Sequence, residues 1–120
     1  MNIEITEHNG VPVALVSSEG IIINSEQDAL DLLGNCGYQG ADAIIISQEN
    51  VSPDFFELRT GLAGNVLQKF SNYCMQLAIV GNFEKYESKS LRDFIYESNK
   101  AKRINFVSTV DEAKQALTGS

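Results

Sequence analysis

The sequence predicts a single α/β domain over residues 1–120, with a mostly parallel sheet of about five strands, an N-terminal antiparallel hairpin and four or five helices. Short apolar segments alternate with longer amphipathic segments, a pattern typical of parallel strands connected by helices. Ala43–Ser47 contains three successive isoleucines, as expected for a central strand covered on both faces. A chain of 120 residues also has the usual size of one domain.

The chain begins with the predicted hairpin. Ile3 and Ile5 alternate with polar residues, which is the pattern of a half-buried strand. The pair Asn9-Gly10 favours a two-residue turn because both residues tolerate positive φ. Residues 11–16 are the returning strand, and a short apolar run follows at residues 21–23.

The first helix is predicted to begin at Ser25, with Asp28 three residues later in the position of a capping box. Its buried side is predicted to comprise Ala29, Leu30, Leu32 and Leu33. We expect it to end at residues that tolerate a left-handed backbone, namely Gly34, Asn35 and Gly37.

The centre of the chain predicts a strand, a helix and a second strand. After Ala43–Ser47, the sequence Ser52-Pro53-Asp54 predicts a short helical turn that carries Phe55 and Phe56. The central helix follows over residues 62–73, and its predicted inner face comprises Leu62, Val66, Leu67, Phe70 and Tyr73. It leads into an apolar strand at residues 77–81. We therefore expect the two strands to be parallel neighbours, with the helix as a right-handed crossover.

The C-terminal part repeats the alternation. A polar loop is predicted over residues 82–90, and Ser90 with Asp93 starts a helix with Leu91, Phe94 and Ile95 inward. Residues 103–108 are the last strand. Thr109 and Glu112 form the capping box of a final helix, whose inner side is predicted to comprise Ala113, Ala116 and Leu117.

Composition and charge exclude several classes of protein. The net charge of −7 and the pI near 4.5 disfavour nucleic acid as a partner, because phosphates repel an acidic surface. The sequence shows neither a signal peptide nor a membrane-spanning stretch, so we expect a cytoplasmic protein without membrane contact. Cys36 and Cys74 are expected to be reduced thiols, at least one of them in the core. One histidine and two cysteines at this spacing predict no metal site, and no cofactor is expected.

The start of the central helix resembles a known family. Arg59-Thr-Gly-Leu-Ala-Gly, between an apolar strand and the strand at residues 77–81, resembles the STAS (anti-sigma-factor antagonist) domain, which carries Asp-Ser-Ser/Thr-Gly-Leu-Gly there in the same order of elements. The resemblance implies a STAS-like fold, with Thr60 at the phosphorylated position and Gly61 and Leu62 after it. Leu58 stands where that family has its aspartate.

Over nearly its full length, the chain resembles more specifically a bacterial family known as domain of unknown function 4180. The matching residues include Phe55-Phe56, residues 62–70 and residues 90–96. This resemblance brings no activity with it.

Two functions remain open from the sequence. The leading hypothesis is a non-enzymatic interaction or regulatory module that binds an unidentified protein through Thr60, Arg59, Gly61 and Leu62. Thr60 is either a phosphorylatable hydroxyl at a helix N-terminus or simply the cap of that helix. The sequence leaves open whether the chain forms a homodimer.

The alternative is a small-molecule-binding protein or an enzyme that uses the crevice at the carboxyl ends of the strands, lined by Ser47, Asn82 and Thr109. His8, the single histidine, lies in a predicted turn, where a preorganised catalytic base is not expected. The basic residues between positions 85 and 103 form either an anion site or, with the acids between them, a mixed solvated face.

Overall fold

The computed structural model describes residues 1–119, which form one mixed five-stranded sheet in the order β1-β2-β3-β4-β5. The strands are Asn2–His8 (β1), Val11–Ser17 (β2), Ala43–Ser47 (β3), Gln76–Val80 (β4) and Ile104–Val107 (β5). The helices are Glu26–Tyr38 (α1), Leu62–Asn72 (α2), Lys89–Ala101 (α3) and Val110–Thr118 (α4). Three short 3-10 helices lie between β3 and α2, at Gln48–Asn50, Pro53–Phe56 and Leu58–Thr60.

The pairing of the strands confirms the predicted topology. β1 and β2 form the antiparallel hairpin, and β2, β3, β4 and β5 run parallel to one another. β3 and β4 are neighbours in the register Ala43↔Gln76 to Ser47↔Val80, with α2 as the crossover between them. Because each strand lies beside the one before it, the strand order never reverses, and the sheet lacks the switch point at which open α/β sheets usually bind ligands.

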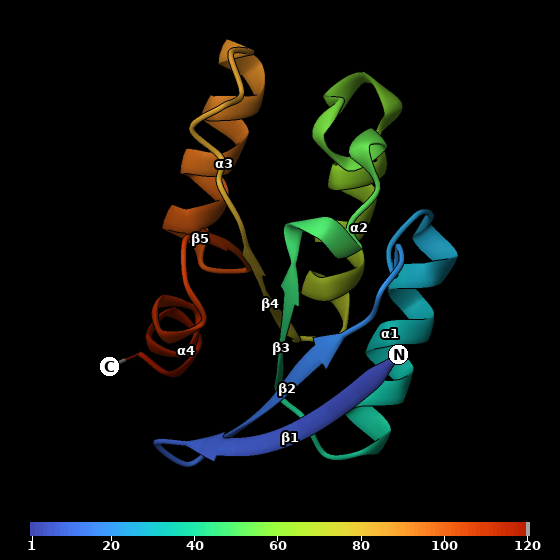
Figure 1. Cartoon of the computed structure of the whole chain (residues 1–120), viewed down its shortest axis with the longest axis vertical. Coiled ribbons are helices and arrows are strands. Elements are labelled where there is room, and N and C mark those ends of the chain that lie inside the picture. Colours follow the sequence, from blue (N-terminus) through green and yellow to red (C-terminus); the bar gives the residue numbers. More distant parts are fainter. Residues whose placement is uncertain (120) are drawn as a thin grey trace.

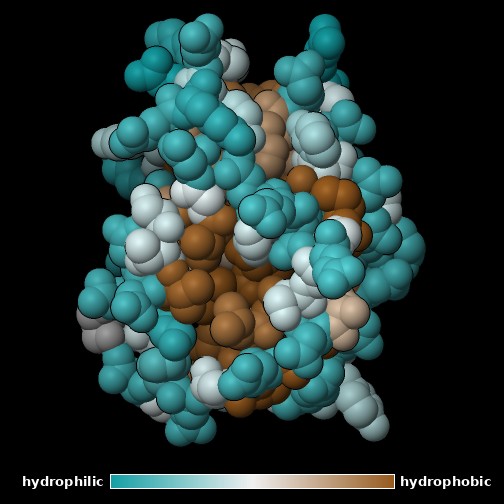
Figure 2. All heavy atoms as spheres, in the orientation of Figure 1, coloured by the Kyte–Doolittle hydropathy of each residue, from teal (hydrophilic) through white to brown (hydrophobic). Residues whose placement is uncertain are grey.

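The two faces of the sheet are covered unequally (Figure 1). α1, α2 and α3 pack on one face, over a large cluster that includes Ile46, Leu77 and Ile104. α4 packs on the other face, mainly over β4 and β5, where Ala113 and Leu117 meet a smaller cluster. Figure 2 shows apolar residues gathered in the middle of the visible face, surrounded by hydrophilic ones. No helix among residues 1–119 is long and apolar enough to cross a membrane.

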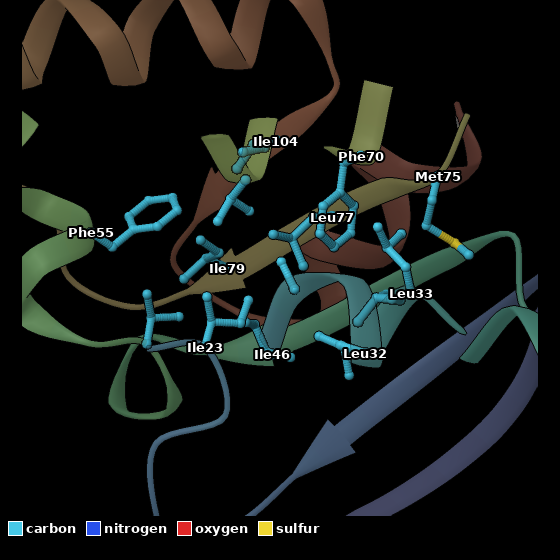
Figure 3. Packing of buried hydrophobic residues seen from close by; sticks show 14 of the residues in the cluster. Ile23, Leu32, Leu33, Ile46, Phe55, Phe70, Met75, Leu77, Ile79 and Ile104 are labelled. Atoms are coloured by element: carbon cyan, nitrogen blue, oxygen red, sulfur yellow. The ribbon is translucent and has the colours of Figure 1, made fainter. Parts of the chain in front are cut away.

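The large cluster contains the aromatic residues predicted for the core. Phe55 and Phe70 are fully buried, and Figure 3 shows Phe55 on the side of Ile23 and Ile79 and Phe70 beside Leu77. Burying a side chain of this size stabilises the fold by roughly 1.5–3 kcal/mol. Cys36 is also fully buried, and desolvation raises the pKa of its thiol to about 11, whereas Cys74 is exposed; both are free thiols.

One buried amide fastens the segment that leads from β2 to α1. Asn50 is 4% exposed, and its Nδ2 donates hydrogen bonds of 2.9 Å to the carbonyls of Ser18 and Gly20. The Asn50 carbonyl accepts from the N–H groups of Ile22 and Ile23. One residue therefore satisfies four backbone groups that would otherwise lack partners beside the core.

Three local predictions are wrong. α1 continues through Gly34, Asn35 and Gly37 to Tyr38, because Cys36 extends the buried face of the helix by one more turn. α3 begins at Lys89 rather than after Ser90, because the hydroxyl of Ser88 accepts from the Leu91 N–H. Tyr73 follows the last residue of α2 and is 64% exposed, so it does not belong to the buried face.

Candidate functional site

An open cleft of about 920 Å³ lies at the carboxyl ends of β4 and β5. The connection from β4 rises beyond the sheet and α3 returns beside it (Figure 1), so the cleft is bounded by residues 81–87, α3 and the end of β5. Its apolar lining comprises Phe83, Ile95, Phe106 and Val107. These residues form an apolar floor of the cleft. The floor lies at the carboxyl ends of the strands, where the alternative hypothesis placed the crevice.

A cluster of aromatic rings holds the floor in place. Phe83 meets Phe106 edge to face, with ring centroids 5.2 Å apart. Tyr86 stacks on Phe56 at 5.0 Å, and Phe56 packs edge to face against the fully buried Phe55. Such pairs are worth roughly 0.5–1.5 kcal/mol beyond their buried area. The loop after β4, predicted as polar, is therefore anchored to the core by its two aromatic residues.

Gln48 clamps the same loop from the end of β3. Its Nε2 donates to the Tyr86 hydroxyl at 2.7 Å, and its Oε1 accepts from the Asn82 N–H at 3.0 Å. Desolvation raises the pKa of the Tyr86 phenol, and the hydrogen bond from Gln48 partly opposes that rise. The Gln48 side chain lies directly against Gly81, where an added Cβ would be 2.6 Å from Gln48 Cβ. A glycine at position 81 is thus required by close approach rather than by a left-handed backbone.

The charged residues of the cleft do not neutralise one another. Arg92, in the first turns of α3, lines the cleft together with Glu84 and Glu87 of the loop. None of the three takes part in an ion pair within residues 1–119. The cleft therefore offers a free guanidinium and two free carboxylates, and Asn82 and Ser108 add an amide and a hydroxyl at its border.

The structure separates the three residues of the predicted crevice. Asn82 lines the cleft, as predicted. Ser47 and Thr109 lie at the same end of the sheet, but their hydroxyls accept from the N–H groups of Glu49 and Glu112 and act as helix caps. Neither is among the residues that line the cleft; their neighbours Gln48 and Ser108 contribute to this region instead.

Thr60 does not cap α2 in the predicted way. The N-cap residue is Gly61, which has φ of 80° and no side chain to accept a hydrogen bond. The Thr60 hydroxyl directs its hydrogen to the carbonyls of Asp54 and Glu57, at 2.7 and 2.9 Å, and accepts only a long bond of 3.3 Å from the Leu62 N–H. It is mainly a donor that joins two 3-10 turns.

The rest of the predicted Thr60 surface is divided between solvent and core. The Arg59 side chain is 88% exposed and pairs with Glu57 at 3.2 Å, whereas Leu62 is buried. Phe55 and Phe56 are also buried, so neither aromatic ring presents an exposed contact there.

We expect Thr60→Ala to lower the free energy of unfolding by about 0.5–1.5 kcal/mol, the usual value of a hydrogen bond. Thr60→Ser should remain near wild type, because serine keeps the donor. Thr60→Asp should be no more stable than Thr60→Ala, because a carboxylate has no hydrogen to donate and would face two carbonyl oxygens. Urea denaturation of the three variants measures this. Full recovery in Thr60→Asp would show that the hydroxyl acts as an acceptor cap.

Other candidate groups lie away from the cleft. His8 ends β1 beside the hairpin turn and pairs with Val11, at the opposite end of the parallel strands. Among residues 1–119, no group of three or more His, Cys, Asp or Glu side chains is arranged to hold a metal ion. The polar and aromatic groups that line the cleft are a guanidinium, carboxylates, an amide, a hydroxyl and aromatic rings.

Most residues of the cleft were not predicted as crevice residues from the sequence. Phe83 and Tyr86 are aromatic residues in an otherwise polar loop, and this composition could have indicated that the loop packs against the core. Arg92 was among the basic residues considered for an anion site, and Ile95 was predicted to face inward. The two are three residues apart in α3, a spacing that places them on one side of a helix. Nothing in the sequence indicated the role of Gln48, because that role depends on the distance between two loops that follow different strands.

Fold and site together define a small α/β domain with one mixed sheet and an open cleft at the carboxyl ends of its last two strands. The chain belongs to the family described as domain of unknown function (DUF4180), whose family model matches residues 8–117. No curated protein matches the chain, and no solved structure does.

Proposed function

We propose that this chain is a non-enzymatic binding module of the cytoplasm, and that the cleft between α3 and residues 81–87 is the surface that recognises a protein partner. The observation that carries the proposal is the free guanidinium of Arg92 beside an apolar floor of aromatic rings. Arginine and aromatic residues are the side chains that dominate binding energy at protein interfaces.

The chemistry of the cleft indicates the kind of segment it binds. An apolar side chain of the partner would pack on Phe83 and Phe106, and a carboxylate next to it would pair with Arg92. Glu84 and Glu87 would repel a second acid and favour a basic residue on the other side. A segment with acidic, apolar and basic residues in succession therefore fits this cleft best.

The openness of the cleft favours a protein over a small molecule. Pockets for small molecules enclose most of the ligand surface, whereas this cleft is bordered by exposed charged side chains on both sides. Its aromatic floor is nevertheless held rigidly by Gln48 and the ring cluster, so a partner would meet a preformed surface.

A second candidate surface is the start of α2. The resemblance to the STAS domain supports a switch in which phosphorylation of Thr60 controls a partner, and both Thr60 and Arg59 are exposed. Phosphorylation would also remove the hydrogen that Thr60 directs to Asp54 and Glu57, and would thereby loosen the two 3-10 turns. On this proposal the STAS-like region, not the cleft, binds the partner.

One pair of charge reversals distinguishes the two surfaces. Arg92→Glu lies in the cleft, and Arg59→Glu makes the same change of charge beside Thr60. A partner captured from the native cell extract by the wild-type chain would be purified, and its affinity measured for both variants. We expect Arg92→Glu to weaken binding about tenfold or more, since a hydrogen bond to a charged group is worth roughly 1.5–3 kcal/mol.

We expect Arg59→Glu to leave the affinity within about twofold of wild type, as for a charge outside the interface. Loss of binding in Arg59→Glu with retention in Arg92→Glu would contradict the cleft proposal and support the Thr60 surface. Wild-type affinity in both variants would contradict both proposed surfaces. Melting temperatures of the two variants control for folding.

A further inference from the structure

The two edges of the sheet differ in how their backbone groups are satisfied. At β5, the Phe106 N–H donates to Asn99 Oδ1 at 2.7 Å, and Asn99 Nδ2 donates to the Phe106 carbonyl at 3.4 Å. The Ser108 N–H donates to Glu112 Oε1 at 2.9 Å. An amide of α3 and a carboxylate of α4 thus take the place of a neighbouring strand, and this edge is closed to a further strand.

The opposite edge, β1, is open. β1 pairs with β2 over all seven of its residues, from Asn2↔Ser17 to His8↔Val11, without a bulge. It contains no proline and no lysine, and Figure 1 shows it as the outermost strand with no element beyond it. Alternate N–H and C=O groups of an edge strand point away from the sheet and are available to another strand. Ile3 and Ile5 on this strand are only partly buried.

We propose that β1 pairs with β1 of a second copy of this chain, antiparallel and about a two-fold axis at Ile5, so that the two sheets become one continuous sheet. In this register all seven residues of β1 find partners. Ile5 of each copy faces Ile5 of the other on the face that α1 covers, and Glu4 of each copy faces Thr6 of the other on the opposite face.

The charges of β1 disfavour two shifted registers, and in the proposed register Glu7 of each copy faces Ile3 of the other. Glu4 and Glu7 are its only charged residues at neutral pH with His8 uncharged. A slip of the two strands that brings Glu4 opposite Glu4, or Glu7 opposite Glu7, would oppose like charges, which is unfavourable for cross-strand pairs. The full-length register avoids both oppositions and also places the two Ile5 side chains together. The pattern therefore fits a second copy of the same strand, and the acids act against misregistered pairing.

Substitutions at Thr6 test the interface, since Thr6 is exposed in the single chain and faces Glu4 only in the dimer. Sedimentation velocity of the full chain over a wide concentration range, at constant salt, measures the dissociation constant. Thr6→Glu should weaken the dimer and Thr6→Lys should strengthen it, each by about two- to thirtyfold, because the pair between position 6 and Glu4 occurs twice in the dimer. Gln68→Glu and Gln68→Lys, on the exposed side of α2, change the net charge equally and should not change the dissociation constant.

Backbone hydrogen exchange of the unaltered chain gives an independent readout. Alternate residues of β1 should exchange more slowly as the concentration rises, while the residues between them, already bonded to β2, stay unchanged. A chain that sediments as a monomer at every concentration would overturn the proposal. A dimer that responds equally to both Thr6 variants, or that follows the Gln68 variants, would also overturn it, because another surface would then form the contact.

Discussion

Asn50→Asp is expected to lower the free energy of unfolding by about 3–5 kcal/mol at pH 7, which is the cost of a buried charge without a partner. The Asn50 Nδ2 group donates to the carbonyls of Ser18 and Gly20, and the residue is 4% exposed. An aspartate carboxylate would place negative charge against the same two carbonyl oxygens. The segment between β2 and α1 would then lose the two hydrogen bonds from the Asn50 side chain and keep those to the Asn50 carbonyl.

The loss of stability in Asn50→Asp should depend on pH. Burial and the facing carbonyls raise the pKa of the introduced carboxyl group in the folded state above the value of about 3.9 for an unfolded chain. The folded state then binds more protons than the unfolded state, so the deficit is smallest below about pH 4 and grows as the pH rises through the folded pKa.

Urea denaturation of Asn50→Asp at several pH values, compared with wild type, measures both effects. Asn65→Asp is the matched control: Asn65 is exposed in the first turn of α2, and the same change should alter stability by no more than about 0.5 kcal/mol. A deficit in Asn50→Asp that equals that of Asn65→Asp, or that shrinks as the pH rises, would contradict the role given to the Asn50 amide.

Gly81→Ala is expected to lower the free energy of unfolding by about 1–3 kcal/mol, as overpacking usually does. The added Cβ would overlap Gln48 Oε1 and lie 2.6 and 3.0 Å from Gln48 Cβ and Cδ. Because Cβ of Gln48 is fixed to the backbone, rotating its side chain cannot relieve the overlap. The hydrogen bond from Gln48 to Tyr86 and the one from the Asn82 N–H to Gln48 should break, and the cleft should lose its fixed border.

Gly64→Ala supplies the control for Gly81→Ala. Gly64 lies in α2 with nothing within 4 Å of an added Cβ, so this variant should gain roughly 0.5–1 kcal/mol from helix propensity. Gln48→Gly in the Gly81→Ala background removes the overlapping atoms and should restore part of the stability without restoring the clamp. Additive effects of Gly81→Ala and Gln48→Gly would show that the two positions do not interact.

Much of the fold could be predicted because it depends on local patterns. The alternation of Ile3 and Ile5, the Asn9-Gly10 turn and the isoleucines of β3 each describe an element by its own residues. The boundaries were less predictable where packing outweighs propensity. α1 passes through two glycines and buries Cys36, whose position continues the helical spacing of Leu32 and Leu33, but the glycines and Asn35 favoured an earlier end of the helix.

The location of the candidate site could be predicted from the sequence, but most of its residues could not. The carboxyl ends of the parallel strands and Asn82 followed from the order of elements. Thr109 was correctly predicted as the cap of the last helix, but it was also assigned to the crevice with Ser47, because a hydroxyl that caps a helix and one that faces a ligand occur in the same sequence context. The donor role of the Thr60 hydroxyl was not predicted. Only the positions of the neighbouring N–H and carbonyl groups distinguish these roles.

The sequence by itself determined the order of the elements, the parallel pairing of β3 with β4 and the acidic surface, since these depend on periodicity and composition. The tertiary structure alone decided the clamp of Gln48 on Gly81, the free charges around Arg92, and the contrast between the closed edge at β5 and the open edge at β1. Each of these joins residues that are far apart in the chain, and their separation in space is set by the packing of helices on the sheet rather than by any local preference.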